Sequence, residues 1–560
     1  MAALRFVGNR RPRALPWLSL AMLCMALTCS ARWVVARAAP AEHAASLACV
    51  PGPHQGNLTT SQDWCPQDNP HVVTFWSAVT SGVTLTLRPG VEVRFPVGGY
   101  LSVMGGATLL AEGTPAQPIV LTSGSASLLA GDWQYLDIQR NARARLAYCD
   151  LAYGGRTGSN LRIESSDVEV RNCRIHHGKD TGLYINGAGL TPLIQDSQID
   201  HVSGHAIYQD WVNAAPVYRN LALTDNGTDG LVLQGGTIDR DLTFDGPGSL
   251  NGKPFYLNST TLASGYTLAV TPGTTLRVAV AGRLTVNDRA TLLAEGTVTR
   301  PITFTSWAAT PQPGDWTFSL DGTVRLAHCD VSASGRGGWG GLEAAGNLWV
   351  RACRIHDNAG RAISASVDRL HLAYTQMDDN PQGLTNLTPA QPVVARNNWW
   401  GHASGPYHSK LNPSGQGLAV SDGVAFEPWL GTYNWLAPFR DLLHGTEWLQ
   451  WAALGTDPGQ AMTVDVLAFQ AGQQHTLGTG LPRSGYLAWN TTLVADGIWE
   501  LQALFRNGAG QVVGQVVRRV GVNNSPQVAY HSGWPSAVPS AAHCSHSIPC
   551  HRSWKGASQL

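Results

Sequence analysis

The sequence has few charged residues and no excess of either sign. Charged residues make up 14% of the 560 residues, and 38 Lys and Arg balance 38 Asp and Glu. A disordered chain needs more charge and fewer than the 43% hydrophobic residues present here. Nucleic-acid-binding chains carry a basic excess that neutralises phosphates. The composition therefore predicts a folded chain with no nucleic-acid partner.

Long apolar runs are missing after the N-terminus. The run Pro16–Ala31 is shorter than the ~20 residues that span a bilayer. Arginines precede it and the small-residue site Ala36–Ala38 follows, which is the order of an export signal. We therefore expect residues 1–38 to be a signal peptide, with an uncleaved anchor as the alternative. Without it, the chain is predicted to have no transmembrane span and to be a monomer, secreted or on the extracellular cell surface.

Local catalytic motifs are missing as well. The sequence has no G-x-S-x-G elbow, no H-E-x-x-H helix, no P-loop and no dinucleotide fingerprint. We therefore expect no cofactor, no metal site and no catalytic residue of these classes. Paired carboxylates for glycoside hydrolysis stay open, because they come from distant segments and leave no local pattern.

Ten cysteines are present, and Cys24 and Cys29 belong to the predicted signal. The other eight form close pairs, which fits an oxidising compartment. The first and last pairs are predicted local disulfides, and the middle pairs depend on the fold. The pairs are Cys49 and Cys65, Cys149 and Cys173, Cys329 and Cys353, and Cys544 and Cys550.

One half of the sequence is a copy of the other. Thr108–Thr114 (TLLAEGT) recurs in full as Thr291–Thr297. Cys173–His176 (CRIH) recurs at nearly the same offset, as Cys353–His356. Such self-similarity indicates a repeat architecture.

Each half also has a finer period, which is about two dozen residues long. Ile175, Ile199 and Leu223 follow this step, and apolar and polar residues alternate around them. Alternation predicts strands with one buried face. Short strands without two-residue turns predict a parallel solenoid, in which each strand stacks on its equivalent one turn later at about 4.8 Å. A series of β-sandwiches is the alternative.

These repeats resemble the right-handed parallel β-helix repeat family of exported bacterial proteins, over about residues 66–430. The TLLAEGT stretches and the closing segment Asn397–Gly401 (NNWWG) with Gly405-Pro406 carry the resemblance. The family includes polysaccharide lyases and hydrolases, and also adhesins and surface proteins without chemistry. The resemblance therefore implies a fold and leaves the function open.

The solenoid turns sequence spacing into neighbouring side chains. His176 is expected next to Asp200, with His177, His201 and Asp225 in the adjacent column. Imidazoles and carboxylates roughly 5 Å apart could bind a ligand, hold a cation or exchange protons. These are outward corner positions, however, where a solvated polar ladder is the expected arrangement.

The same stacking places two cysteine pairs one turn apart. Cys149 and Cys173, and likewise Cys329 and Cys353, are separated by one period of the repeat. Stacked Cα atoms at roughly 5 Å lie within the range of a disulfide. Buried thiols acting as small apolar residues are the equal alternative.

The domain organisation follows from these patterns. After residue 435, alternating strands separated by turns predict a small β-sandwich. Gly485–Thr492 and Asp496–Leu501 resemble immunoglobulin- or fibronectin-III-like modules. The expected units are a signal peptide (1–38), an N-terminal cap (39–75), a β-helix (76–435), a β-sandwich (436–523) and a tail (524–560).

The sequence thus predicts an all-β fold, a right-handed parallel β-helix solenoid followed by a small β-sandwich. The predicted function is that of an exported or cell-surface scaffold or binding protein, carbohydrate-binding or adhesive, without catalytic activity. Its expected partners are polysaccharide or cell-surface components. A polysaccharide lyase or glycoside hydrolase acting on an extended polysaccharide is the alternative.

Overall fold

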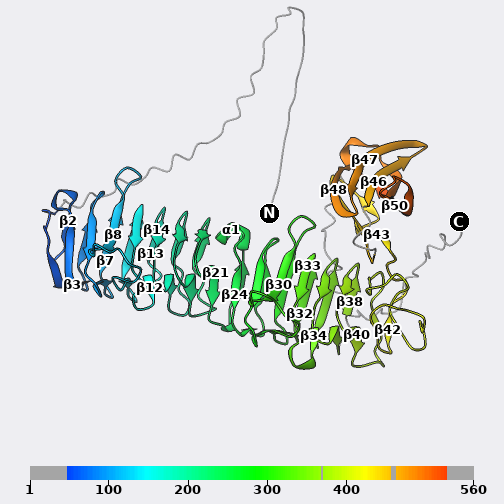
Figure 1. The fold of residues 1–560 in the computed structure, drawn as a ribbon, viewed down its shortest axis with the longest axis horizontal. Coiled ribbons are helices and arrows are strands. Elements are labelled where there is room, and N and C mark those ends of the chain that lie inside the picture. Colours follow the sequence, from blue (N-terminus) through cyan, green and yellow to red (C-terminus); the bar gives the residue numbers. More distant parts are fainter. Residues whose placement is uncertain (1–46, 367–369, 456–461, 526–560) are drawn as a thin grey trace, which may run out of the picture. The chain divides into compact units, whose positions relative to one another are not determined.

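Short strands stacked in parallel make up most of the molecule. The structure is a computed structural model and describes residues 47–366, 370–455 and 462–525. From β1 (His54–Leu58) to β42 (Val424–Ala425), strands pair in parallel with those of neighbouring turns (Figure 1). The predicted all-β fold and its parallel solenoid are therefore confirmed. The predicted signal peptide and Cys544 and Cys550 lie outside the described residues.

The predicted stacking of Ile175, Ile199 and Leu223 is confirmed. Ile175 pairs with Ile199, and Ile199 pairs with Leu223. Each of the three residues is 1% exposed. Burying each side chain contributes about 1.5–3 kcal/mol, so the inner columns supply much of the stability. The three residues belong to β14 (Arg174–His176), β17 (Gln198–Asp200) and β20 (Ala222–Thr224).

One turn of the solenoid contributes a strand to each of three sheets. In the first half, β4 pairs with β7, β5 with β8, and β6 with β9. We name the three sheets after β4, β5 and β6. These strands are β4 (Thr84–Leu87), β5 (Glu92–Phe95), β6 (Tyr100–Val103), β7 (Thr108–Glu112), β8 (Ile119–Ser123) and β9 (Leu136–Ile138).

The two copies are joined one sheet out of step. In the duplicated sequence, β27 (Thr275–Val278) corresponds to β5. It stacks instead on β24 (Phe255–Leu257), and β24 stacks on β21 (Thr228–Leu233) of the β6 sheet. Equivalent columns of the two copies therefore continue in different sheets.

A short helix marks this join. The side chain of Asp245 caps α1 (Gly246–Leu250) by accepting a hydrogen bond from the Gly248 N–H. The Gly248 carbonyl accepts a hydrogen bond of 3.1 Å from the Asn220 N–H, just after β19 (Val217–Arg219). Since β19 is the last strand of the β4 sheet, the helix covers its end and the second copy starts new sheets.

The middle cysteine pairs are thiols, so the structure has the second of the two predicted alternatives. Cys149 and Cys173 are buried and free, as are Cys329 and Cys353. The Sγ of Cys149 donates to the Ala111 carbonyl at 3.2 Å, and the Cys173 Sγ accepts from the Cys149 N–H at 3.4 Å. Burial raises the pKa of Cys149 and Cys329, so both thiols stay protonated at neutral pH. The two inter-turn disulfides are not formed.

Peptide mapping checks this assignment. After unfolding without reductant, we expect iodoacetamide to alkylate all four middle cysteines, because free thiols react once exposed. Cys49 and Cys65 should be labelled only after reduction. Resistance of Cys149 and Cys173 to alkylation before reduction would contradict the thiol assignment.

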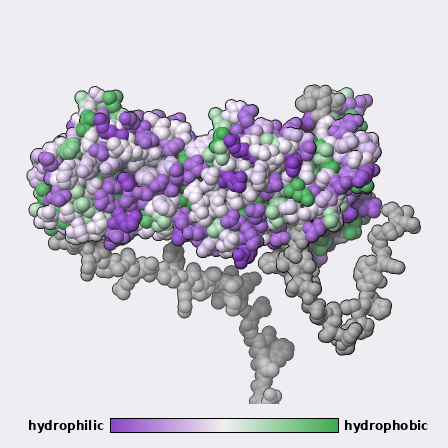
Figure 2. All heavy atoms as spheres, turned by 90° about the horizontal axis from the view of Figure 1, so that it is seen from below, coloured by the Kyte–Doolittle hydropathy of each residue, from purple (hydrophilic) through white to green (hydrophobic). Residues whose placement is uncertain are grey.

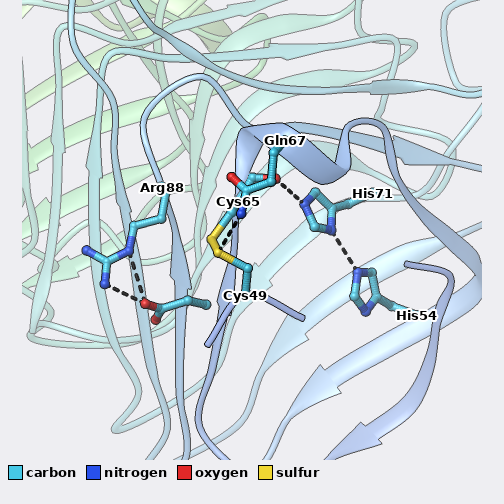
Figure 3. Close-up of a disulfide and its surroundings, with 7 residues drawn as sticks. Cys49, His54, Cys65, Gln67, His71 and Arg88 are labelled. Carbon is cyan, nitrogen blue, oxygen red and sulfur yellow. Dashed lines mark hydrogen bonds and ion pairs between the residues drawn. A yellow bond between two sulfur atoms is a disulfide. The ribbon is translucent and has the colours of Figure 1, made fainter. Parts of the chain in front are cut away.

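The N-terminal end of the solenoid carries a disulfide beside two buried histidines (Figure 3). Cys49 and Cys65 are bridged with their Cα atoms 5.6 Å apart. His71 Nε2 lies 2.9 Å from the Cys65 carbonyl, and His71 Nδ1 lies 3.0 Å from His54 Nε2. A carbonyl can only accept, so Nε2 of His71 carries its proton and Nδ1 accepts from His54. In this arrangement His71 donates from Nε2 and accepts at Nδ1.

This histidine pair predicts loss of stability in mild acid. Burial, followed by the neighbouring His71, lowers the pKa of His54 from 6.5 to about 4. The unfolded chain protonates His54 at a higher pH than the folded chain does. The free energy of unfolding is therefore highest above about pH 6.5, and it falls by about 2–3 kcal/mol as the pH is lowered towards 4. Denaturation of the wild type and of His54→Phe, which cannot titrate here, measures the effect. Parallel pH curves for the two proteins would contradict it.

The C-terminal part of the chain closes the solenoid and adds a smaller β region. Trp400 is fully buried in the solenoid core at its C-terminal end. The following strands form a three-stranded and a five-stranded sheet around a shared core that includes Trp451, Trp499 and Phe505. The immunoglobulin-like assignment stays a prediction. The strands are β43 (Tyr433–Ala437), β45 (Thr446–Ala453) and β48 (Ser484–Asn490), and β44 (Leu442–Leu443), β46 (Thr463–Gln470), β47 (Gln473–Pro482), β49 (Gly497–Arg506) and β50 (Val512–Val522).

The surface is mixed in character. On the face shown in Figure 2, hydrophobic residues form small separate patches among polar ones. Within the described residues, no helix has the length and apolar character needed to cross a membrane.

Candidate functional site

The predicted histidine and aspartate column forms a ladder of hydrogen bonds that includes one arginine–aspartate ion pair. His176 and Asp200 are register partners on neighbouring turns. His176 Nε2 lies 2.8 Å from Asp150 Oδ1, on the preceding turn. Arg174 donates to both carboxylate oxygens of Asp200 at 2.9 and 2.6 Å, and His201 Nδ1 lies 2.8 Å from Asp200 Oδ2. The predicted proximity is correct.

The expectation of a solvated ladder is wrong for its central members. His176 is 8% exposed and Asp200 is 1% exposed. Burial alone would raise the pKa of Asp200, but hydrogen bonds from Arg174 and His201 hold it below its usual value. The guanidinium covers the carboxylate, which explains why a corner position is dry. Asp225 is exposed, and no described hydrogen bond joins it to the ladder.

The second column is a stack of imidazoles. The rings of His177 and His201 lie 5.1 Å apart at an angle of 5°. His177 Nδ1 also lies 2.6 Å from His176 Nδ1. Burial, followed by His176 and His201, lowers the pKa of His177. In the described ranges, no three His, Cys, Asp or Glu side chains are grouped so as to hold a metal ion.

A matching ladder occurs in the second copy. His356 Nε2 lies 3.1 Å from Asp330 Oδ1, and Arg354 pairs with Asp378 at 2.9 Å. An arrangement retained in both copies, with its charges paired to each other, suits cross-linking of successive turns. We therefore assign the ladder a structural role.

A different column on the outer face of the β6 sheet was missed in the sequence. Its register partners are Ser102, Asp137, Arg162, Tyr184 and Tyr208 on successive turns. Along each strand these residues alternate with the buried ones, so their side chains point away from the core. The strands after β9 are β12 (Ser159–Ile163), β15 (Thr181–Ile185) and β18 (His205–Gln209).

Aromatic rings make this face continuous. The ring centroids of Tyr184 and Tyr208 are 5.8 Å apart, and those of Tyr208 and His205 are 5.7 Å apart. Trp307 lies 6.4 Å from His205 and 5.0 Å from Tyr256. All five residues are half-buried, so part of each ring surface stays accessible. We call this set the aromatic strip.

At its N-terminal end, the aromatic strip is bordered by polar groups. The Arg162 guanidinium lies 5.7 Å from the centre of the Tyr184 ring, and it pairs with Glu164. The Tyr184 hydroxyl donates to Asp210 Oδ2 at 3.0 Å. Burial, followed by Asp210, raises the pKa of Tyr184 to about 12, so the hydroxyl keeps its proton. Burial also raises the pKa of Asp137.

The second copy lacks these residues. Where the first copy has Asp137, Arg162, Tyr184 and Tyr208, the stacked positions of the second copy carry small residues and one glutamate. They are Ser319, Glu343, Ser364 and Thr385. Because both copies build the same solenoid, the fold does not require aromatic residues here. The strip is therefore the candidate functional site.

Comparisons with known proteins agree with the fold. Residues 62–161 match a family described as a pectate-lyase-like β-helix domain, and residues 133–247 match the right-handed β-helix region. Tyr184 and Tyr208 lie within the second match. No curated protein and no solved structure matches the chain. Together with the parallel strand pairing, these matches show that this part of the chain is a right-handed parallel β-helix.

Proposed function

We propose that this β-helix protein is an exported scaffold that binds an extended polysaccharide along the aromatic strip. The observation that carries the proposal is the difference between the copies. Tyr184 and Tyr208 of the first copy correspond to Ser364 and Thr385 in the second, while the structural ladder is retained in both. A polysaccharide is the proposed ligand because the strip follows successive turns of the solenoid and is bordered by hydrogen-bonding groups.

The geometry of the solenoid suits an extended polymer. Tyr184 and Tyr208 are direct register partners, so their rings follow the spacing of the turns, about 4.8 Å. Rings at such spacing can pack against successive sugar units, whose C–H faces are apolar. Asp210, Gln234 and Arg162 stand next to the rings and can bond the sugar hydroxyls. The solenoid thus provides a preformed surface, which lowers the entropic cost of binding.

One observation favours cleavage of a polysaccharide as a second candidate function. The raised pKa of Asp137 keeps a carboxyl group close to the protonated state that a general acid needs, and Glu164 lies on the next turn. Asp137 is only 7% exposed, however, and Arg162 lies between it and the strip. A covered carboxyl cannot reach a glycosidic oxygen, so binding is the function that the geometry supports better.

Incubation with a panel of soluble and immobilised polysaccharides separates the two functions. The expected result is retention of the protein on one or a few polymers, with no rise in reducing or unsaturated chain ends. Chain ends that appear with the wild type and disappear with Asp137→Asn would favour cleavage. Absence of retention on every neutral, acidic and aminated polymer would overturn the proposed function.

A further inference from the structure

The first copy has an open groove at the edge of the β5 sheet, away from the aromatic strip. Its volume is 540 Å³. A column of left-handed residues on successive turns forms one wall, and the amide of Asn220 donates to Asp196 Oδ1 at 2.9 Å. Side chains in the groove include Pro118, Tyr148, Asn172, Asp196, Gln198 and Asn220.

The equivalent groove of the second copy has matching walls but a smaller volume, 190 Å³. Leu436 and Gln450, which come from β43 and β45, line it as well. These two strands pair in an antiparallel manner. The matching wall residues are Pro301, His328, Ala352, Tyr374 and Gln376, which replace Pro118, Tyr148, Asn172, Asp196 and Gln198.

An aromatic ring of the same segment completes this occupied groove. The Phe439 ring lies 5.6 Å from His328 and 5.2 Å from Tyr374, centroid to centroid. The Arg351 guanidinium lies 4.4 Å from the centre of the Phe439 ring. The second groove is therefore lined by a leucine of β43, and the phenyl ring that follows this strand packs on two of the groove residues.

We propose that the open groove of the first copy docks a protein partner with the same chemistry. The partner presents the edge of a β-hairpin with a leucine and an aromatic ring. In the open groove, Asn172 and Asp196 stand where the second groove has Ala352 and Tyr374. We therefore expect the partner to carry a basic residue next to its aromatic ring, and this residue pairs with Asp196. The chain's own segment already has this composition, because Arg440 follows Phe439.

A labelled peptide of residues 433–453 is the probe, tested against the full chain by fluorescence anisotropy. We expect saturable binding of one peptide per chain. Gln198→Trp fills the open groove and should weaken binding at least about tenfold, a loss of about 1.4 kcal/mol. Val217→Trp, on an exposed position of β19 outside the groove, should leave binding unchanged. The Phe439→Ala form of the peptide should bind at least about tenfold more weakly.

A second variant checks the comparison between the grooves. In the full chain, Leu436→Ala with Phe439→Ala should free the second groove and raise the stoichiometry from one peptide to two. Binding to the freed second groove alone would overturn the proposal. Absence of saturable binding to the wild type, or binding that Gln198→Trp does not change, would overturn it too.

Discussion

Replacement of both Tyr184 and Tyr208 by alanine is expected to weaken polysaccharide binding at least about 100-fold. Each ring contributes about 1.5 kcal/mol through its buried area and its contact with a sugar face, and each 1.4 kcal/mol is a factor of ten. The two rings are adjacent register partners with centroids 5.8 Å apart, so the variant removes the centre of the strip. Affinity electrophoresis and calorimetry with the polymer selected from the panel measure the loss.

The second copy supplies the matched control. Ser364→Ala with Thr385→Ala changes the equivalent pair of stacked positions and should leave binding unchanged. Tyr184→Phe with Tyr208→Phe keeps both rings and removes only the hydroxyls, so most of the affinity should remain. If the alanine pair binds as well as the wild type while remaining folded, the strip is not the binding surface.

The fold was predictable because the inner columns repeat in the sequence. Ile175, Ile199 and Leu223 are equally spaced and fill the same kind of interior position, so their spacing reports the turn directly. The proximity of His176 and Asp200 follows from the same register. A repeating pattern of residue types can be seen in a single sequence when successive turns contain the same number of residues.

Burial at the corners was not predictable in this way. The spacing shows that Asp200 neighbours His176, but its dryness depends on how the Arg174 side chain folds over the carboxylate. The state of Cys149 has a similar origin, since the direction of its sulfur depends on a bond to the Ala111 carbonyl. The direction of a side chain depends on packing, so it cannot be read from the spacing of residues in the sequence.

The aromatic strip was missed because its residues cross the join between the copies. Tyr184 and Tyr208 follow the period, as neighbours of the buried Leu183 and Ile207. Tyr256 comes two periods after Tyr208 and Trp307 is much later, yet they complete the same face. The insertion of α1 shifts the second copy by one sheet, and a shift of this kind appears only in the strand pairing.

Arg174→Ala is expected to lower the free energy of unfolding by about 1–3 kcal/mol. The substitution removes two hydrogen bonds from the Asp200 carboxylate and exposes it to water, while the bond to His201 remains. Arg354→Ala breaks the equivalent pair in the second copy, where the Asp378 side chain is 27% exposed. Water can replace the lost bonds there, so about 1 kcal/mol is expected. Denaturant unfolding of the two variants gives the comparison.

Two further measurements separate the effect of losing the Arg174 side chain from the effect of leaving the Asp200 carboxylate without its partner. Asp200→Asn in the Arg174→Ala background removes the charge and should recover part of the stability. In wild type the pKa of Asp200 is lowered by its partners, so its contribution persists until the pH falls through that low value. In Arg174→Ala the lowering by the guanidinium is lost, so the pKa of Asp200 rises and the carboxylate is protonated at a higher pH than in wild type. The difference between the two proteins should therefore narrow as the pH is lowered from neutral, and equal losses for Arg174→Ala and Arg354→Ala at every pH would show that burial of Asp200 does not set the cost.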